Sequence, residues 1–199
     1  MTIVMSDRRL LYLNAFLRAL ATGMVGVLIG IHLAKRGFDP GETGIVVSLG
    51  LAGAAAAAML VTLLGDRVGR RRMLILLALF GAGGGVVAAL ASSFTVMLAA
   101  AFLGMVNGMG RDRGAALILD QVILPATVSD TQRTASFAWY NVLQDAGHAI
   151  GGLAAGLPVL FLRLDGMDEV TALQYAVLVY AGLLGLSALA YARLSPAAE

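Results

Sequence analysis

The chain has 199 residues, of which 59% are hydrophobic and 13% are charged, and its formal net charge is +2. Soluble domains carry about 25% charged residues. This composition, with a mean hydropathy of +0.87, therefore excludes an ordinary water-soluble domain and indicates a polytopic α-helical membrane protein. The small net charge gives no support to nucleic-acid binding. The absence of cysteine excludes disulfides, thiolate metal sites and thiol catalysis, and we expect neither a metal nor another cofactor.

Six apolar segments can each span a bilayer, which requires about 20 mostly apolar residues. They define a single six-helix transmembrane domain over residues 1–199, with helices expected at about 10–34, 45–64, 73–91, 94–124, 134–162 and 172–191. The fourth and fifth segments exceed what the bilayer requires, so we expect their cytoplasmic ends to project from it as helix. The first segment is too long for the apolar region of a signal peptide, and we expect it to remain as a transmembrane helix.

Basic residues predict the orientation, because cytoplasmic loops carry an excess of arginine and lysine. With the N-terminus inside, the outer side holds Lys35, Arg36 and Arg163. The cytoplasmic side then holds the larger group, which consists of Arg8, Arg9, Arg67, Arg70, Arg71, Arg72, Arg133 and Arg193. We therefore expect a multi-pass protein of the plasma (inner) membrane with both termini in the cytoplasm.

The first predicted helix carries Asn14 and Arg18, which are four residues apart and share a face. Arg18 lies about 13 Å into the span at the helical rise of about 1.5 Å per residue, too deep for its charge to reach the interface comfortably. Ionisable residues inside a membrane are functional candidates by default. Two interpretations stay open: contact with an anionic substrate or counter-ion in a cavity, and a structural pair with a carboxylate on another helix.

The connection between the second and third predicted helices contains an aspartate among arginines. The positive-inside rule explains the arginines but not Asp66. In this place of a six-helix layout, the segment resembles the signature loop of the major facilitator superfamily, although Thr62 stands where the family pattern begins with glycine. The residues that match are Asp66, Arg67, Gly69, Arg70, Arg71 and Arg72.

The fourth predicted helix carries a charged cluster near its cytoplasmic end. Consecutive helical residues point about 100° apart, since a turn takes about 3.6 residues, so Arg111, Asp112 and Arg113 face three directions. Arg111 shares a face with Asn107, and both are candidates for a transport cavity. Asp112, Arg113 and Asp120 are candidates for a charge network with the Asp66 loop, and a purely structural network is the alternative.

The fifth predicted helix carries a stripe of polar residues. Asn141, Asp145 and His148 follow one face at helical spacing, with Gln144 at its shoulder. A carboxylate and an imidazole one turn apart could relay protons or coordinate a substrate. The alternative is a polar seam bonded to the first or fourth helix, for example through an Asp145–Arg18 pair.

The resemblance implies both a fold and a function. The superfamily fold has two six-helix halves of 3+3 inverted repeats, and the loop identifies this chain with the N-terminal half. We therefore expect secondary active transport of a small solute in the lipid bilayer, with a second six-helix half as partner, either a separate chain or a second copy. The resemblance also implies that Asp66 faces the N-terminal end of a helix in that other half, where the helix dipole favours negative charge.

Several functional alternatives bear on this expectation. Intramembrane arginines favour an anionic substrate, and the lack of a nucleotide motif favours an ion gradient as the energy source. The Gly-x-Ser-Gly nucleophile of a rhomboid-like intramembrane protease is missing, so no enzyme activity is expected. A non-transporting, truncated or regulatory membrane subunit stays open as the alternative function.

Overall fold

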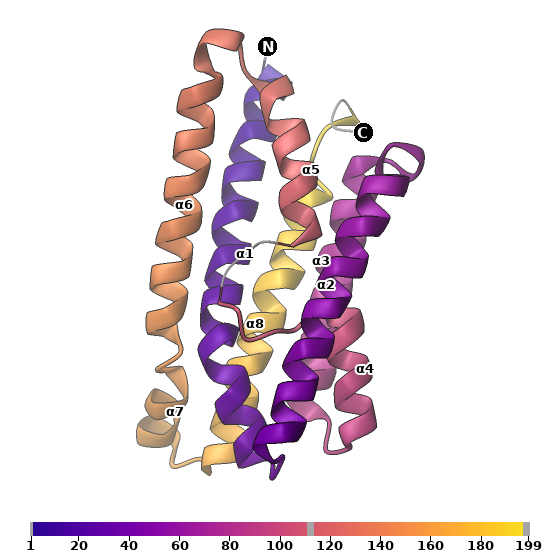
Figure 1. Ribbon diagram of the computed structural model, residues 1–199. Coiled ribbons are helices and arrows are strands. Elements are labelled where there is room, and N and C mark those ends of the chain that lie inside the picture. The colour runs from indigo at the N-terminus through magenta and orange to yellow at the C-terminus, as the bar shows by residue number, and fades with distance from the viewer. Residues whose placement is uncertain (1, 111–113, 197–199) are drawn as a thin grey trace.

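The computed structural model describes residues 2–110 and 114–196, and within these ranges it is helical with no strand. The elements in chain order are α1 (Thr2–Lys35), α2 (Pro40–Val68), α3 (Arg70–Leu90), α4 (Phe94–Gly104), α5 (Ala115–Ile123), η1 (Leu124–Thr127), η2 (Asp130–Gln132), α6 (Arg133–Ala154), α7 (Leu157–Asp165) and α8 (Glu169–Tyr191). The long helices stand side by side in one bundle, and both chain ends lie at the same end of it (Figure 1). The turn between α2 and α3, which follows Asp66 in the last turn of α2, lies at that end too.

The helices have the lengths and compositions of membrane spans. Among the described residues, five segments are long and apolar enough to cross a bilayer, namely Asp7–Lys35, Pro40–Val68, Arg70–Leu90, Asp130–Arg163 and Glu169–Tyr191. Two shorter apolar helices, Phe94–Gly104 and Ala115–Thr127, occupy the region of the predicted fourth span. The expected class, an all-α membrane protein, is therefore confirmed.

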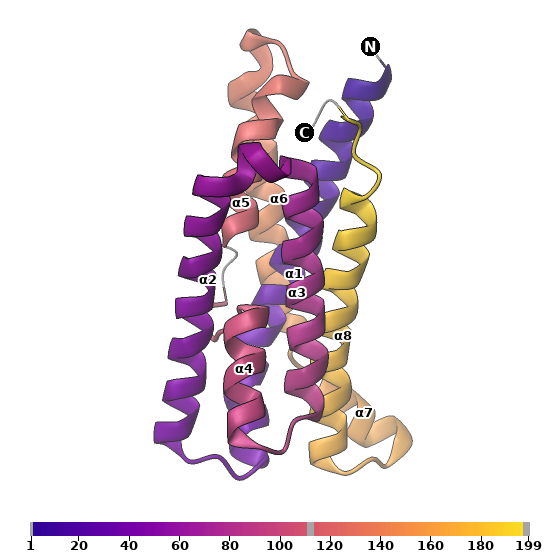
Figure 2. The same cartoon turned by 90° about the vertical axis from the view of Figure 1, so that its right-hand side faces the viewer.

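The fourth span differs from the continuous helix expected over 94–124. It is divided into α4 in the lower half of the bundle and α5 in the upper half (Figure 2). α4 ends because Met105 adopts a left-handed conformation (φ 54°), which lets the Val106 amide donate to the Ala101 carbonyl at 3.0 Å. Asn107 closes the next turn, donating to the Met105 carbonyl at 2.9 Å and accepting from the Met109 amide at 3.0 Å.

The composition around this interruption explains why a helix does not continue. Gly104, Gly108 and Gly110 lie within seven positions of one another, and each glycine costs about 1 kcal/mol relative to alanine in a helix interior. Gly110 has φ 65°, a conformation that glycine adopts without steric penalty. Apolar periodicity alone predicted one helix over 94–124. The glycines and Asn107 interrupt it, so the region forms two helices.

The fifth predicted span, 134–162, is likewise divided. α6 ends at Ala154, and α7 begins at Leu157 with Pro158 in its first turn, where the missing amide costs no helical hydrogen bond. α7 lies at the end of the bundle opposite the chain termini (Figure 1).

Helix α1 is at the centre of the packing, with α6 on one side and α8 on the other. The contact with α6 is close because of glycine: a Cβ added at Gly151 would lie 2.2 Å from the Leu20 carbonyl oxygen. α3 packs against α8, and α2 and α3 both pack against α4. Apolar side chains form two buried clusters along the bundle, one around Met24 and Leu28 and one around Leu11 and Leu74.

Candidate functional site: a buried ion pair beside a cavity

An ion pair between α1 and α5 lies inside the bundle. Arg18 donates from Nη1 to Oδ2 of Asp120 at 2.8 Å, and the two side chains are 6% and 0% exposed. Tyr140 of α6 donates to the same carboxylate oxygen at 2.8 Å and accepts from Arg18 Nη2 at 3.1 Å. Tyr191 of α8 donates toward both carboxylate oxygens at 3.3 Å. Four helices thus meet at what we call the Arg18–Asp120 centre, formed by these four residues.

The chemistry of the Arg18–Asp120 centre explains how two charges are tolerated there. Removing a charge from water is costly unless an opposite charge and further hydrogen bonds replace the lost hydration. Asp120 receives one guanidinium and two phenol donors, and the guanidinium carbon of Arg18 also lies 5.8 Å from the Tyr191 ring centroid, within cation–π range. The pair is electrically neutral as a unit, so losing either member would leave an uncompensated charge.

A cavity of about 300 Å³ opens beside this centre, inside the helix bundle. It lies at the interruption of the fourth span, and α1, α2, α3 and α8 form its other walls. The described polar side chains that line it belong to Arg18, Thr22, Asn107, Tyr180 and Tyr191. Among the described residues that line it, Arg18 is the one with a formal charge, and the remaining walls are mostly alanine, glycine and leucine. Its volume falls at the lower limit of the range for small-molecule sites.

The residues expected to line a transport cavity are distributed between different environments. Arg18 and Asn107 border the cavity. Asn14 is buried elsewhere: it donates to the Leu10 carbonyl at 3.0 Å and accepts from the Ser187 hydroxyl at 2.6 Å, and so joins α1 to α8. Arg111 lies outside the described residues, as do Asp112 and Arg113.

The expected charge network of the fourth helix is also distributed differently. Asp120 was grouped with Asp112, Arg113 and the Asp66 loop, whereas the structure places it against Arg18 in the interior. Arg18 thus has a carboxylate partner on another helix, but that partner is Asp120 rather than Asp145. Tyr140, Tyr191 and Thr22 were not expected at the site. Their sequence signal is weak, because tyrosine and threonine at a helix position are ordinary packing residues.

The polar stripe of α6 divides between two faces. Gln144 is buried and His148 is half-buried, whereas Asn141 and Asp145 are exposed on the surface of the bundle. A carboxylate in the membrane-spanning part is expensive against lipid. The exposed position of Asp145 therefore favours a polar or protein surface opposite this face of α6.

The Asp66 loop, residues 66–72, contains one residue outside the helices, Gly69, and an ion pair between Asp66 and Arg70. α2 ends at Val68, Gly69 has φ 98°, and α3 begins at Arg70. Asp66 accepts from Arg70 Nη2 at 2.8 Å and from Nε at 3.1 Å, and its side chain is 85% exposed. Arg71 donates to the Ala192 carbonyl at the end of α8, so the loop is fastened to the last helix of the bundle.

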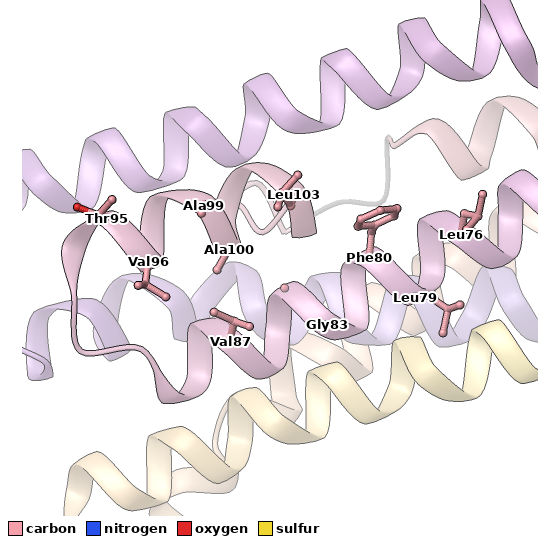
Figure 3. A pocket seen from close by; sticks show the side chains of 11 residues that line it. Leu76, Leu79, Phe80, Gly83, Val87, Thr95, Val96, Ala99, Ala100 and Leu103 are labelled. Carbon is pink, nitrogen blue, oxygen red and sulfur yellow. The ribbon is translucent and has the colours of Figure 1, made fainter.

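A second hollow, of about 640 Å³, lies on the outside of the bundle between α3 and α4 (Figure 3). Its labelled side chains are apolar except for Thr95, and they come from both helices, such as Phe80 of α3 and Leu103 of α4. With the Thr95 hydroxyl as the one polar side-chain group among its described lining residues, this groove has the character of a lipid-facing surface. The smaller cavity beside Arg18 is therefore the candidate site.

Comparisons with known proteins agree with the membrane architecture. The family model described as Major Facilitator Superfamily matches residues 11–199. The uncharacterized membrane protein YJR124C of Saccharomyces cerevisiae is 24% identical over 174 residues, which cover 87% of this chain and 39% of the yeast protein. The chain thus spans about two fifths of the length of that relative. No solved structure matches the chain.

Proposed function

Since the chain belongs to the Major Facilitator Superfamily, a family of membrane transporters, we propose that it takes part in secondary active transport of a small solute. The observation that carries this proposal is the Arg18–Asp120 centre beside an interior cavity. Ionisable residues inside a membrane protein mark solute and ion pathways, because their cost must be offset by function or by pairing. A cavity whose described lining has one guanidinium, a few uncharged polar side chains and otherwise apolar walls suits an organic anion.

The transporter is completed by a second six-helix unit, from a separate chain or a second copy. Two exposed carboxylates support this part of the proposal. Asp145 is exposed on α6, where an opposing protein surface would remove it from lipid. Asp66 lies at the end of the bundle with its side chain 85% exposed, where a helix N-terminus of another unit could meet it.

The proposed location is the plasma (inner) membrane, with both termini and the Asp66 loop in the cytoplasm. The distribution of arginines supports this orientation. Arg67 lies in the last turn of α2, and Arg70, Arg71 and Arg72 begin α3. The turn between these helices lies at the end of the bundle that also holds both termini (Figure 1).

Transport is tested by uptake into proteoliposomes. The full chain, purified with any unit that copurifies from its own membranes, is reconstituted and supplied with labelled small organic anions under imposed proton and sodium gradients. We expect gradient-driven uptake that Arg18→Ala abolishes. Arg163→Gln serves as the control, because Arg163 is an exposed arginine of α7, away from the cavity.

The outcome also separates the two candidate functions. Uptake that equals that of empty liposomes for every anion and gradient, with a correctly folded and assembled protein, would contradict transport and favour a non-transporting subunit. Uptake that Arg18→Ala leaves intact would show that the solute path does not use the interior cavity.

A further inference from the structure

We propose that the interior cavity opens sideways into the lipid bilayer, through a passage between α2, α3 and the end of α4, and that its solute is a lipophilic compound that enters from the membrane. This inference rests on the proposed function, because it names the route and the class of solute for the same cavity. The passage has three parts: the groove between α3 and α4, a hollow of about 220 Å³ that we call the connecting hollow, and the interior cavity.

The connecting hollow lies where α2, α3 and the end of α4 meet. The described residues that form its walls are glycine, alanine, valine, leucine, methionine and phenylalanine. Leu60 of α2, Phe80 of α3 and Leu103 of α4 belong to these walls, and they are 53%, 52% and 56% exposed. The connecting hollow is therefore apolar and faces the outside of the bundle.

The three spaces share walls, so they lie in series. Leu76, Phe80 and Leu103 line both the groove and the connecting hollow. Figure 3 shows these side chains around the end of α4, with Leu76 and Phe80 on the part of α3 that extends beyond it. On the inner side, Leu77 and Met105 line both the connecting hollow and the interior cavity. The side chains of Leu77 and Met105 therefore stand between the connecting hollow and the interior cavity.

The interruption of the fourth span places this passage near the middle of the bilayer. α4 ends at Gly104, and residues 105–110 leave the helical conformation. From Phe94, where α4 begins at the end of the bundle opposite the chain termini, to Gly104 the helix rises about 15 Å at about 1.5 Å per residue. The hydrocarbon core is about 30 Å thick, so the passage meets the lipid near the ends of the acyl chains.

The inner wall of the passage consists of adaptable side chains. Leu77 is partly buried, and Met105 follows the last turn of α4 rather than lying inside a helix. Methionine is unbranched, with three rotatable bonds, so its side chain adjusts to irregular spaces. We expect new rotamers of these two side chains, rather than movements of α2 or α3, to open and close the passage.

The walls of the connecting hollow define the class of solute. They are apolar in the part that the structure describes, and a charged group in such surroundings is strongly disfavoured. An alkyl chain has no such cost, and an organic acid passes in its uncharged form. Inside, the polar end of the solute reaches Arg18 and Thr22 of the interior cavity. The solute is therefore a long-chain amphipathic compound that first dissolves in the membrane.

Photolabelling of the full chain in liposomes tests the passage. The probe is hexadecanol with a diazirine near the middle of its chain, dissolved in the bilayer, and mass spectrometry of the illuminated protein locates the labelled residues. Helix α8 supplies both readouts. Tyr180 and Leu184, the interior pair, line the interior cavity and are buried, whereas Leu186 and Leu189, the outer pair, are exposed on the outside of the bundle. We expect label at both pairs, because the probe reaches the outer pair from the lipid and the interior pair through the passage.

Two variants with opposite effects identify the route. Ala56→Phe fills the connecting hollow, and we expect it to abolish the label at the interior pair while the label at the outer pair is kept. Ala52→Phe is the matched control, since Ala52 is an exposed residue of the same helix outside the three spaces, and it should keep both labels. Leu77→Ala removes part of the inner wall and should increase the label at the interior pair relative to the outer pair.

The results against the proposal are equally specific. An unlabelled interior pair in the wild-type protein would overturn entry from the membrane, and interior label that Ala56→Phe and Leu77→Ala leave unchanged would overturn this route. In both cases, gradient-driven uptake of anions would still support the proposed function. Conversely, interior label that depends on the connecting hollow, without uptake of any solute, would support the passage and contradict transport. If Ala56→Phe fails to fold, Leu77→Ala decides alone, because entry through the connecting hollow requires its interior label to rise.

Discussion

Helix α6 has two faces that treat polar groups in opposite ways. On its inner face, Tyr140 is buried and bonded to Arg18 and Asp120, and Gly151 lies against α1. On its outer face, Asn141 and Asp145 are exposed beside apolar residues such as Leu153. The inner face satisfies its polar groups within this unit, so it determines stability. The outer face leaves a carboxylate for a neighbour, so we expect it to determine assembly and transport.

Removing the carboxylate from the Arg18–Asp120 centre should have the largest effect on the free energy of unfolding. Asp120→Ala leaves Arg18 buried and without this carboxylate, and we expect a loss of about 3–5 kcal/mol in the free energy of unfolding. Thermal or denaturant unfolding in detergent measures this loss. The double variant Arg18→Met with Asp120→Leu should recover most of the stability, because no charge is then left behind. A double variant as unstable as Asp120→Ala would contradict this explanation.

Removing the phenol hydroxyl of Tyr140 should have the next largest effect on the free energy of unfolding. Tyr140→Phe keeps the ring but removes the donor to Asp120 and the acceptor for Arg18, and hydrogen bonds to charged groups contribute about 1.5–3 kcal/mol. Unfolding of the purified variant measures the loss. Trp139→Phe, at the exposed neighbouring position, is the control and should change stability little. Equal effects of the two variants would show that the two faces do not differ.

Adjacent glycines offer a direct comparison of the two faces by packing alone. Gly151→Ala places a methyl group 2.2 Å from the Leu20 carbonyl, which forces α1 and α6 apart and should cost about 1–3 kcal/mol. Gly152→Ala meets no atom within 4 Å, and it should be neutral or stabilising by up to about 1 kcal/mol, since alanine favours helix. Their midpoints of unfolding should therefore shift in opposite directions or differ clearly. Equal shifts would mean that α6 is not held against α1 by this contact.

The smallest effect on stability is expected at the outer face. Asp145→Asn should change the free energy of unfolding by less than about 0.5 kcal/mol, because the side chain is exposed. Crosslinking between α6 and a second unit, together with uptake into proteoliposomes, should nevertheless decrease. A variant with full crosslinking and full uptake would show that the outer face of α6 has no part in assembly.

The membrane class and the approximate spans could be predicted from the sequence, because apolar length and the distribution of arginines are local properties. The depth of Arg18 also marked it as an unusual residue. Its partner could not be predicted, because a continuous helix over 94–124 assigned Asp120 to the cytoplasmic edge. The interruption after Gly104 depends on how Met105 and Asn107 fold back on preceding carbonyls, which periodicity does not encode. Tyr140 was not expected at the site, and its inward direction follows from the packing of α6 on α1.

The joint at Gly69 has a mechanical consequence for the Asp66 loop. A single residue connects two membrane-spanning helices, and the Asp66–Arg70 hydrogen bonds bridge it. Because Gly69 alone connects the two helices, α2 cannot slide along α3 in the direction of the membrane normal. The two helices must therefore tilt together about the end of the bundle that holds Gly69.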